Sequence, residues 1–135
     1  MESIYIRNLD QAEWHKHTQE EIDNGADPDL RFCFLVDRDI QASHGLSIGC
    51  LVLPVGGELP PHRHKPQELY VIKSGTGEMH LPDMTTRPVR ENDFVYIPEN
   101  ERHGLINTGE TPLEILWIFP TDSFRDVEYG YLNEG

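Results

Sequence analysis

Short apolar runs separated by turn residues constrain the fold of this chain more than any other feature. The 135 residues include 11 glycines and 10 prolines, spread along the whole sequence. They leave many runs of strand length, which is typical of an all-β sandwich or barrel. Connections this short force neighbouring strands to pair antiparallel, and a jelly-roll barrel hides the edges of such a sheet. The predicted strands are residues 30–36, 46–53, 68–73, 78–81, 87–90, 94–97, 103–107 and 113–119.

The N-terminal segment departs from this pattern. Residues 4–6 form a further strand-like run. Residues 11–22 are polar, and Asp10 stands at a position where it can cap a short helix, with Glu13 completing a capping box. We therefore predict a short helical segment before the first long strand.

The C-terminal segment, residues 121–135, is polar apart from a few aromatic residues that include Phe124 and Tyr129. We expect it to pack across the mouth of the barrel or against a neighbouring molecule. A chain of this length can bury a core and an internal site within a single domain.

The charge of the chain excludes several classes of partner. There are 24 acidic and 11 basic residues, which gives a formal net charge of -13. A phosphate backbone or an anionic membrane surface would be repelled, so we predict no nucleic acid and no membrane partner. No apolar run approaches the roughly 18 residues that a spanning helix needs.

The two cysteines, Cys33 and Cys50, lie far apart in the sequence and form no CxxC pair. This excludes a disulfide scaffold and a thiolate zinc cluster, and we expect two buried, reduced thiols. The first residues lack the basic and apolar regions of a signal peptide. The simplest prediction is a cytoplasmic protein.

Four residues in the middle of the chain form a candidate metal site. His62 and His64 are two apart, so an extended chain projects both to the same face. Glu68 begins the next predicted strand, and His103 begins a later one. Imidazole and carboxylate together suit one divalent transition metal such as Fe, Mn, Ni or Zn, and this ligand set does not choose among them. Four such ligands leave a coordination position open for catalysis.

The spacing of these residues resembles a known family. The pattern G-x5-H-x-H-x3-E-x6-G, from Gly56 to Gly75, matches the first signature of the cupin superfamily, and P-x-N-x2-H-x3-N, from Pro98 to Asn107, resembles the second. Asn92 and Asn100 replace two usual glycines, and asparagine is the non-glycine residue that best tolerates positive φ. The resemblance implies one cupin jelly-roll domain over residues 1–135, with a barrel core of about 46–119, an N-terminal segment 1–25 and a tail 120–135. It also implies that His62, His64, Glu68 and His103 hold one metal inside the barrel.

Strand alternation extends the candidate site. Tyr70 lies two residues after Glu68, so the two side chains share a face and Tyr70 also points toward the cavity. A buried tyrosine needs a partner for its hydroxyl, either the metal pocket or a backbone carbonyl. Trp117 is expected in the core or the cavity wall. His15 and His17 lie in a polar segment and are expected to be solvated.

Within the cupins, the chain resembles the small dimethylsulfoniopropionate (DMSP) lyases. The resemblance rests on residues 45–49, 62–64, 68–71 and 117–129. It implies a β-elimination that yields dimethyl sulfide and acrylate, with the substrate carboxylate bound at the metal. Tyr70 corresponds to the base of that family, and Tyr129 to a second tyrosine near the substrate. Trp117, Tyr129 or Phe34 can hold the sulfonium by a cation–π contact.

Other functions remain open on the same scaffold, because fold does not fix function. The ligand set equally allows a non-haem iron dioxygenase, a cupin isomerase or a decarboxylase, and a non-catalytic cupin that binds a small molecule is a further alternative. The expected partner is a small carboxylate or zwitterionic substrate. We also expect a homodimer, with residues 4–6 as an exchanged edge.

Overall fold

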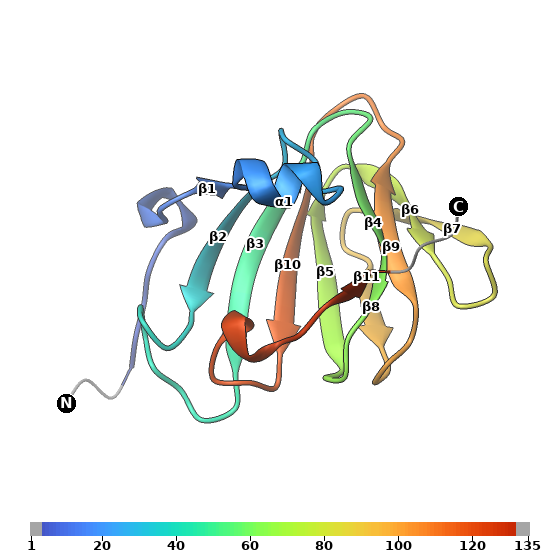
Figure 1. Cartoon of the computed structure of the whole chain (residues 1–135). Helices are drawn as coiled ribbons and strands as arrows, with labels where there is room; N and C mark the ends of the chain where they lie inside the picture. Colours follow the sequence, from blue (N-terminus) through green and yellow to red (C-terminus); the bar gives the residue numbers. More distant parts are fainter. Residues whose placement is uncertain (1–3, 132–135) are drawn as a thin grey trace.

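Two antiparallel β-sheets make up almost the whole structure, which is a computed structural model that describes residues 4–131. The sheets face each other (Figure 1), so the predicted all-β cupin jelly roll is confirmed. The six-stranded sheet has the order β1 (His15–Lys16), β2 (Arg31–Val36), β3 (Ser47–Leu53), β10 (Leu113–Phe119), β5 (Glu68–Ser74) and β8 (Phe94–Ile97). The five-stranded sheet has the order β11 (Gly130–Tyr131), β4 (Glu58–Arg63), β9 (His103–Asn107), β6 (Thr76–His80) and β7 (Thr86–Arg90).

The core lies between the sheets, and β10 is its central strand because it pairs with both β3 and β5. Residues of β10 alternate between buried and half-buried, as expected for a strand with one face in the core. Leu113 and Ile115 are fully buried on this strand, and Leu105 of β9 joins them from the other sheet. The apolar alternation that predicts residues 113–119 therefore also fixes which face is inside.

The N-terminal segment differs from its prediction. Residues 4–6 form no strand, and the predicted helix over residues 11–22 is replaced by a 3-10 turn η1 (Leu9–Gln11), strand β1 and helix α1 (Gln19–Asp23). The physical reason lies in the caps: Asn8 with Gln11, and Thr18 with Glu21, each form a complete capping box. Between these two short elements, β1 pairs with β2. The expected dimer contact at residues 4–6 stays a prediction.

The two asparagines that replace the usual glycines both occupy the left-handed region. Asn92 has a φ of 73° and Asn100 a φ of 61°. Each therefore takes the backbone conformation that a glycine would supply at that turn. The departures from the family pattern leave both turns intact.

The side chain of Asn107, at the end of β9, is 2% exposed. Its Nδ2 donates to the carbonyls of Leu53 and Pro54, each at 3.1 Å, and to that of Thr111 at 2.9 Å. Its Oδ1 accepts from the backbone N–H of Gly109 at 2.9 Å. A single amide thus ties the connection after β3 to the connection between β9 and β10.

The C-terminal segment packs on the barrel, as expected, through η2 (Phe124–Asp126) and the pairing of β11 with β4. It is anchored by Asp37, whose carboxylate accepts from Ser123 Oγ at 2.7 Å and from the backbone N–H of Phe124 at 2.9 Å. Asp37 and Ser123 are both buried, so this anchor is shielded from water. Residues 132–135 lie outside the described part.

The cysteines, distant in sequence, are neighbours in space. Cys33 on β2 lies directly opposite Cys50 on β3, and both are fully buried and free. The hydrogen bond with Cys33 and burial raise the pKa of the Cys50 thiol. A raised pKa makes the Cys50 thiol unreactive. The hydrogen bond with Cys50 lowers the pKa of Cys33, so the expected structural role rests on the burial of both sulfurs.

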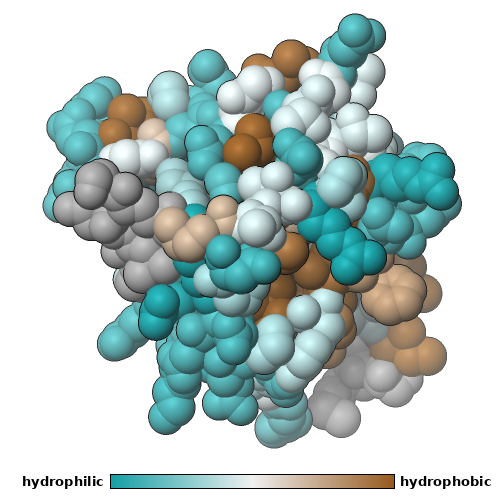
Figure 2. Space-filling model, turned by 90° about the vertical axis from the view of Figure 1, so that its right-hand side faces the viewer, coloured by the Kyte–Doolittle hydropathy of each residue, from teal (hydrophilic) through white to brown (hydrophobic). Residues whose placement is uncertain are grey.

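The outer surface is mostly hydrophilic, in line with the many charged residues of the chain. Hydrophilic residues cover most of the face shown in Figure 2, with a hydrophobic strip near its middle. Within residues 4–131, no helix is long and apolar enough to cross a membrane.

Candidate metal centre

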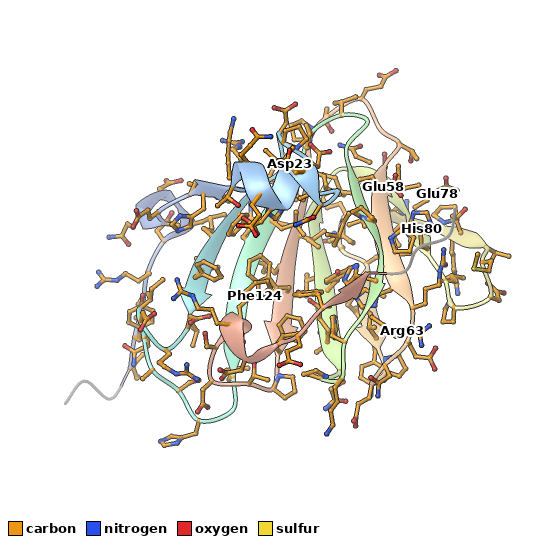
Figure 3. The ribbon with its side chains drawn as sticks, in the orientation of Figure 1. Asp23, Glu58, Arg63, Glu78, His80 and Phe124 are labelled. Carbon is orange, nitrogen blue, oxygen red and sulfur yellow. The ribbon has the colours of Figure 1, made fainter. Side chains whose placement is uncertain are left out.

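Three histidines from two neighbouring strands meet inside the barrel. His62 on β4 is the direct register partner of His103 on β9, and His64 follows the end of β4. The ring centroids lie 4.2 Å apart for His62 and His103, and 4.8 Å apart for His64 and His103. All three are at most 3% exposed. Arg63, between two of them, points outward (Figure 3), as strand alternation requires.

Each ring is oriented by a backbone carbonyl two residues away. Nδ1 of His62 lies 2.7 Å from the Pro60 oxygen, and Nδ1 of His64 lies 2.8 Å from the Pro66 oxygen. Nδ1 of His103 lies 2.9 Å from the oxygen of Glu101. A carbonyl can only accept, so Nδ1 donates in each ring, and Nε2 is the nitrogen left to bind a metal. This is the second-shell arrangement typical of histidines that bind a metal through Nε2.

The facing nitrogens and a carboxylate fit a cation. The three histidines offer ligand atoms that all lie within 4.8 Å of one another. Glu68 Oε1 lies 3.1 Å from Nε2 of His64 and 3.3 Å from Nε2 of His103, and this last nitrogen is buried without a hydrogen bond. Acceptors facing each other at such distances need a proton or a metal ion between them. Ligands about 2.1 Å from one metal are themselves about 3 Å apart, so the donor set fits a divalent ion.

Burial keeps the centre ready for metal. Desolvation, followed in size by the charge of neighbouring His103, lowers the pKa of His62 from 6.5 to about 3. His62 is therefore neutral near pH 7, the form in which imidazole binds a metal.

A cavity of about 260 Å³ adjoins this group. This volume is below the roughly 300–1,000 Å³ of pockets that hold drug-sized ligands, so it suits a small molecule. Its lining is mainly apolar and aromatic, and it includes Glu68, Tyr70, Tyr129, Phe32, Trp117 and Phe124. The sequence predicts that Trp117 lies in the core or in the cavity wall, and the structure places it in the cavity wall.

Both tyrosines singled out in the sequence lie beside the histidines. Tyr70 on β5 is 2% exposed, and its ring centroid lies 6.1 Å from that of His103. The Tyr129 ring lies 5.1 Å from His62 and 5.1 Å from His64. Strand β5 places the first tyrosine, whereas the anchored C-terminal segment places the second. The structure therefore brings together all six predicted site residues.

The aromatic candidates for binding a cation separate into two groups. Trp117 and Tyr129 line the cavity. Phe34 instead packs edge-on against Trp117 at 6.1 Å and lines a different hollow. Gly49 leaves room for the indole, because a Cβ at this position would lie only 2.0 Å from a Trp117 ring carbon.

Two cavity residues were missed by the sequence prediction. His17 and Glu21, from the N-terminal segment, also line the cavity. His17 packs on Phe32 with ring centroids 5.2 Å apart, so the expectation that it is solvated is wrong. No local sequence pattern indicates that His17 and Glu21 line the cavity. Their placement depends on β1 pairing with β2 and on α1 crossing the upper ends of β3 and β10 (Figure 1).

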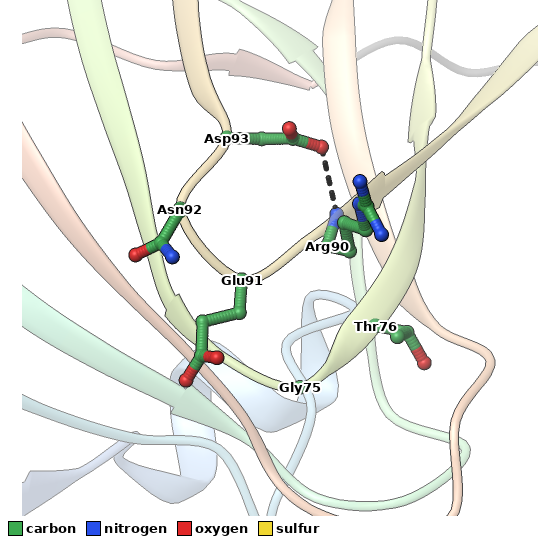
Figure 4. A pocket seen from close by; sticks show the side chains of 6 residues that line it. All are labelled: Gly75, Thr76, Arg90, Glu91, Asn92 and Asp93. Atoms are coloured by element: carbon green, nitrogen blue, oxygen red, sulfur yellow. Dashed lines mark hydrogen bonds between the residues drawn. The ribbon is translucent and has the colours of Figure 1, made fainter.

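A larger hollow of about 610 Å³ lies elsewhere, between two turns (Figure 4). It is lined by residues 75–76 and 90–93, none of which is buried. Its turn is closed by Asp93, which accepts from the backbone N–H of Arg90 at 2.9 Å. This open surface lacks the buried polar groups that mark the smaller cavity as the candidate site.

A pair formed by a histidine and a glutamate lies away from the cavity. His80 Nε2 lies 2.9 Å from Glu58 Oε1, and Figure 3 shows both near the five-stranded sheet. Glu58 is half exposed, so this pair stabilises the surface only weakly.

Known proteins resemble this chain in sequence and in fold. The dimethylsulfoniopropionate lyase DddW of Ruegeria pomeroyi is 28% identical over 113 residues, which cover 82% of this chain and 73% of that protein. The polyketide cyclase RemF of Streptomyces resistomycificus superimposes with a TM-score of 0.80 at 16% identity, covering 98% of this chain and 87% of that one. The DMSP lyase DddQ of Ruegeria pomeroyi gives a TM-score of 0.67 at 23% identity, covering 82% and 57%. Both structural matches speak for the fold alone.

The family itself is identified by a direct match. Residues 49–119, more than half of the chain, match the family model described as "Cupin domain". This range contains all three histidines and Glu68, as well as strands from both sheets of the barrel. The chain therefore belongs to the cupin family.

Proposed function

We propose that this cupin is a divalent-metal-dependent lyase that cleaves a small carboxylate by β-elimination, with DMSP as its substrate. The observation that carries the proposal is the placement of Tyr70 and Tyr129 against the three-histidine group in one small aromatic cavity. The similarity to the lyase DddW supports the choice of reaction.

The metal would be held by Nε2 of His62, His64 and His103, with the carboxylate of Glu68 as the fourth ligand. A divalent ion there supplies a Lewis acid for the substrate carboxylate and a positive charge that favours the phenolate of a nearby tyrosine. The carbonyls that hold each Nδ1 keep the rings oriented toward that position.

Tyr70 acts as the base in this proposal. Its phenolate oxygen takes a proton from the carbon next to the substrate carboxylate, and the resulting electron pair forms the C=C bond of acrylate. The bond between the β-carbon and sulfur breaks, and its electrons leave with neutral dimethyl sulfide. The leaving group starts as a sulfonium, so no protein acid is needed to protonate it.

The remaining cavity residues position the substrate and exclude water. Tyr129 covers the histidines from the side of the C-terminal segment, and the faces of Trp117 and Phe124 are available to the sulfonium. Tight aromatic packing around a cavity of this size favours an extended, oriented small ligand over bulk water.

The experiment is dimethyl sulfide release by protein stripped and reloaded separately with Fe, Mn, Ni or Zn. We expect metal-dependent release, and we expect Tyr70→Phe to lower kcat by at least about 100-fold while metal content is unchanged. Tyr96→Phe is the matched control, since this tyrosine is exposed on the outer edge strand. Stoichiometric metal binding without release by any metal form would contradict the proposal, and oxygen consumption by the iron form would then favour a dioxygenase.

A further inference from the structure

The cavity carries a second carboxylate that the proposed elimination does not use. Glu21 of α1 lines the same cavity as Glu68 but belongs to an element outside the barrel strands. We propose that Glu21 is a specificity-determining residue that selects zwitterions, with a methylated cation facing Glu21 and a carboxylate at the histidine centre, over plain carboxylates. This inference rests on the metal site of the proposed function but not on the elimination step.

The local hydrogen bonds keep Glu21 ionised and in place. Its Oε1 accepts from the backbone N–H of Thr18 at 2.8 Å, and this hydrogen bond lowers the pKa of the carboxyl group. Nδ1 of His17 lies 3.3 Å from the other oxygen of Glu21. The side chain of Glu21 is half exposed, so a charge on a ligand in the cavity is only partly screened from it.

The aromatic surroundings of Glu21 suit a methylated cation. The cavity wall includes Phe32, Trp117 and Phe124, whose ring faces attract a methylated onium group but offer no hydrogen-bond acceptors. Among the described residues, no lysine or arginine lines the cavity. The net charge of -13 adds a negative potential around it.

A pair of probes isolates the charge from the shape. Trimethylammoniopropionate and its carbon isostere, in which a quaternary carbon replaces the nitrogen, have the same outline and the same carboxylate. Their dissociation constants for the zinc-loaded full-length protein are measured by calorimetry. We expect the zwitterion to bind about tenfold more tightly, a preference that shrinks at high salt.

The test variant is Glu21→Gln, which removes the charge but keeps the capping box, because glutamine also serves at that position. We expect its preference for the zwitterion to fall about fivefold. Glu20→Gln is the matched control, since Glu20 neighbours Glu21 on α1, is exposed and does not line the cavity. This variant should keep the preference of the wild type.

Three outcomes overturn the inference: equal affinity of the wild type for both probes, equal effects of the two variants, or no binding of either probe. Each is independent of dimethyl sulfide release. A protein that prefers the zwitterion but releases no dimethyl sulfide would retain this inference and lose the proposed elimination.

Discussion

Strand β9 carries two buried polar residues whose surroundings differ. Asn107, at its end, is satisfied entirely by protein: its amide donates to backbone carbonyls and accepts from Gly109. His103, at its start, uses Nδ1 for a carbonyl but leaves Nε2 buried without a hydrogen bond. The two are similarly buried, at 2% and 3% exposed. They differ in whether the fold alone completes their bonding.

This difference separates a structural end of the barrel from a functional one. Buried polar groups in proteins are nearly always hydrogen-bonded, so an exception calls for an explanation such as a bound ion. At the Asn107 end no such explanation is needed. At the His103 end, two further histidines and Glu68 lie close to the same point, and a metal ion there would complete the set.

The strongest way to break the comparison is His103→Ala. We expect metal affinity to fall more than about 100-fold, with dimethyl sulfide release lost in parallel, because one of three histidine ligands is removed. Metal content after dialysis and turnover are the measurements. His44→Ala, at an exposed turn, is the control that should change neither. Retained metal in the His103 variant would contradict the assignment of this end as functional.

Asn107→Ala should produce the opposite phenotype. The free energy of unfolding should fall by about 3 kcal/mol, because several buried backbone groups lose their partner at once. Urea unfolding of the metal-free protein measures this loss. Metal affinity of the folded fraction should stay within about twofold of the wild type, since no metal ligand contacts the amide. A large loss of metal affinity would mean that the two ends are coupled.

Acid should lower the free energy of unfolding of the metal-free protein by a smaller amount. In the metal-free unfolded chain His62 binds a proton near its ordinary pKa of 6.5, whereas in the folded protein it does so only near about 3. Between these two pKa values the unfolded state therefore holds more protons than the folded state. The contribution of His62 to the free energy of unfolding is fully present above pH 6.5 and decreases as the pH falls. By about pH 5 the loss from this residue should reach about 2 kcal/mol.

His62→Gln tests this assignment, because glutamine does not titrate in this range. Urea unfolding should show that the free energy of unfolding of the metal-free variant falls by about 2 kcal/mol less than that of the wild type when the pH is lowered to about 5. Identical slopes for the two proteins would show that His62 does not cause the acid sensitivity.

Much of the fold was predictable where local pattern and tertiary packing agree. The bounds of β8, β9 and β10 match the predicted strands, because apolar alternation and flanking turn residues indicate the same ends. Strand β4 was not predicted, since Pro60 and Pro61 interrupt its pattern. The N-terminal helix was misplaced because two other capping boxes form, one at Asn8 and one at Thr18, and strand β1 lies between the two short elements that they begin.

The candidate site divides in the same way. His62, His64 and Glu68 are close in sequence and stand within the wider pattern from Gly56 to Gly75, so that pattern predicts a shared site, and His103 follows from the second motif. Tyr129 was reached only through family resemblance, because its position depends on the buried Asp37 anchor. Contacts between distant segments, which bring His17 and Glu21 to the cavity, leave no periodic signal in the sequence.

The anchored C-terminal segment has a consequence for the order of biosynthesis. The three histidines and Glu68 precede Phe124 and Tyr129 in the chain, so the ribosome completes the metal ligands before the tyrosine that covers them. A nascent or proteolysed chain that stops before Phe124 therefore contains every ligand of the centre but lacks Tyr129. In the proposed function, the ligands of the ion and the tyrosine that completes the substrate pocket therefore belong to segments of the chain that are made at different times.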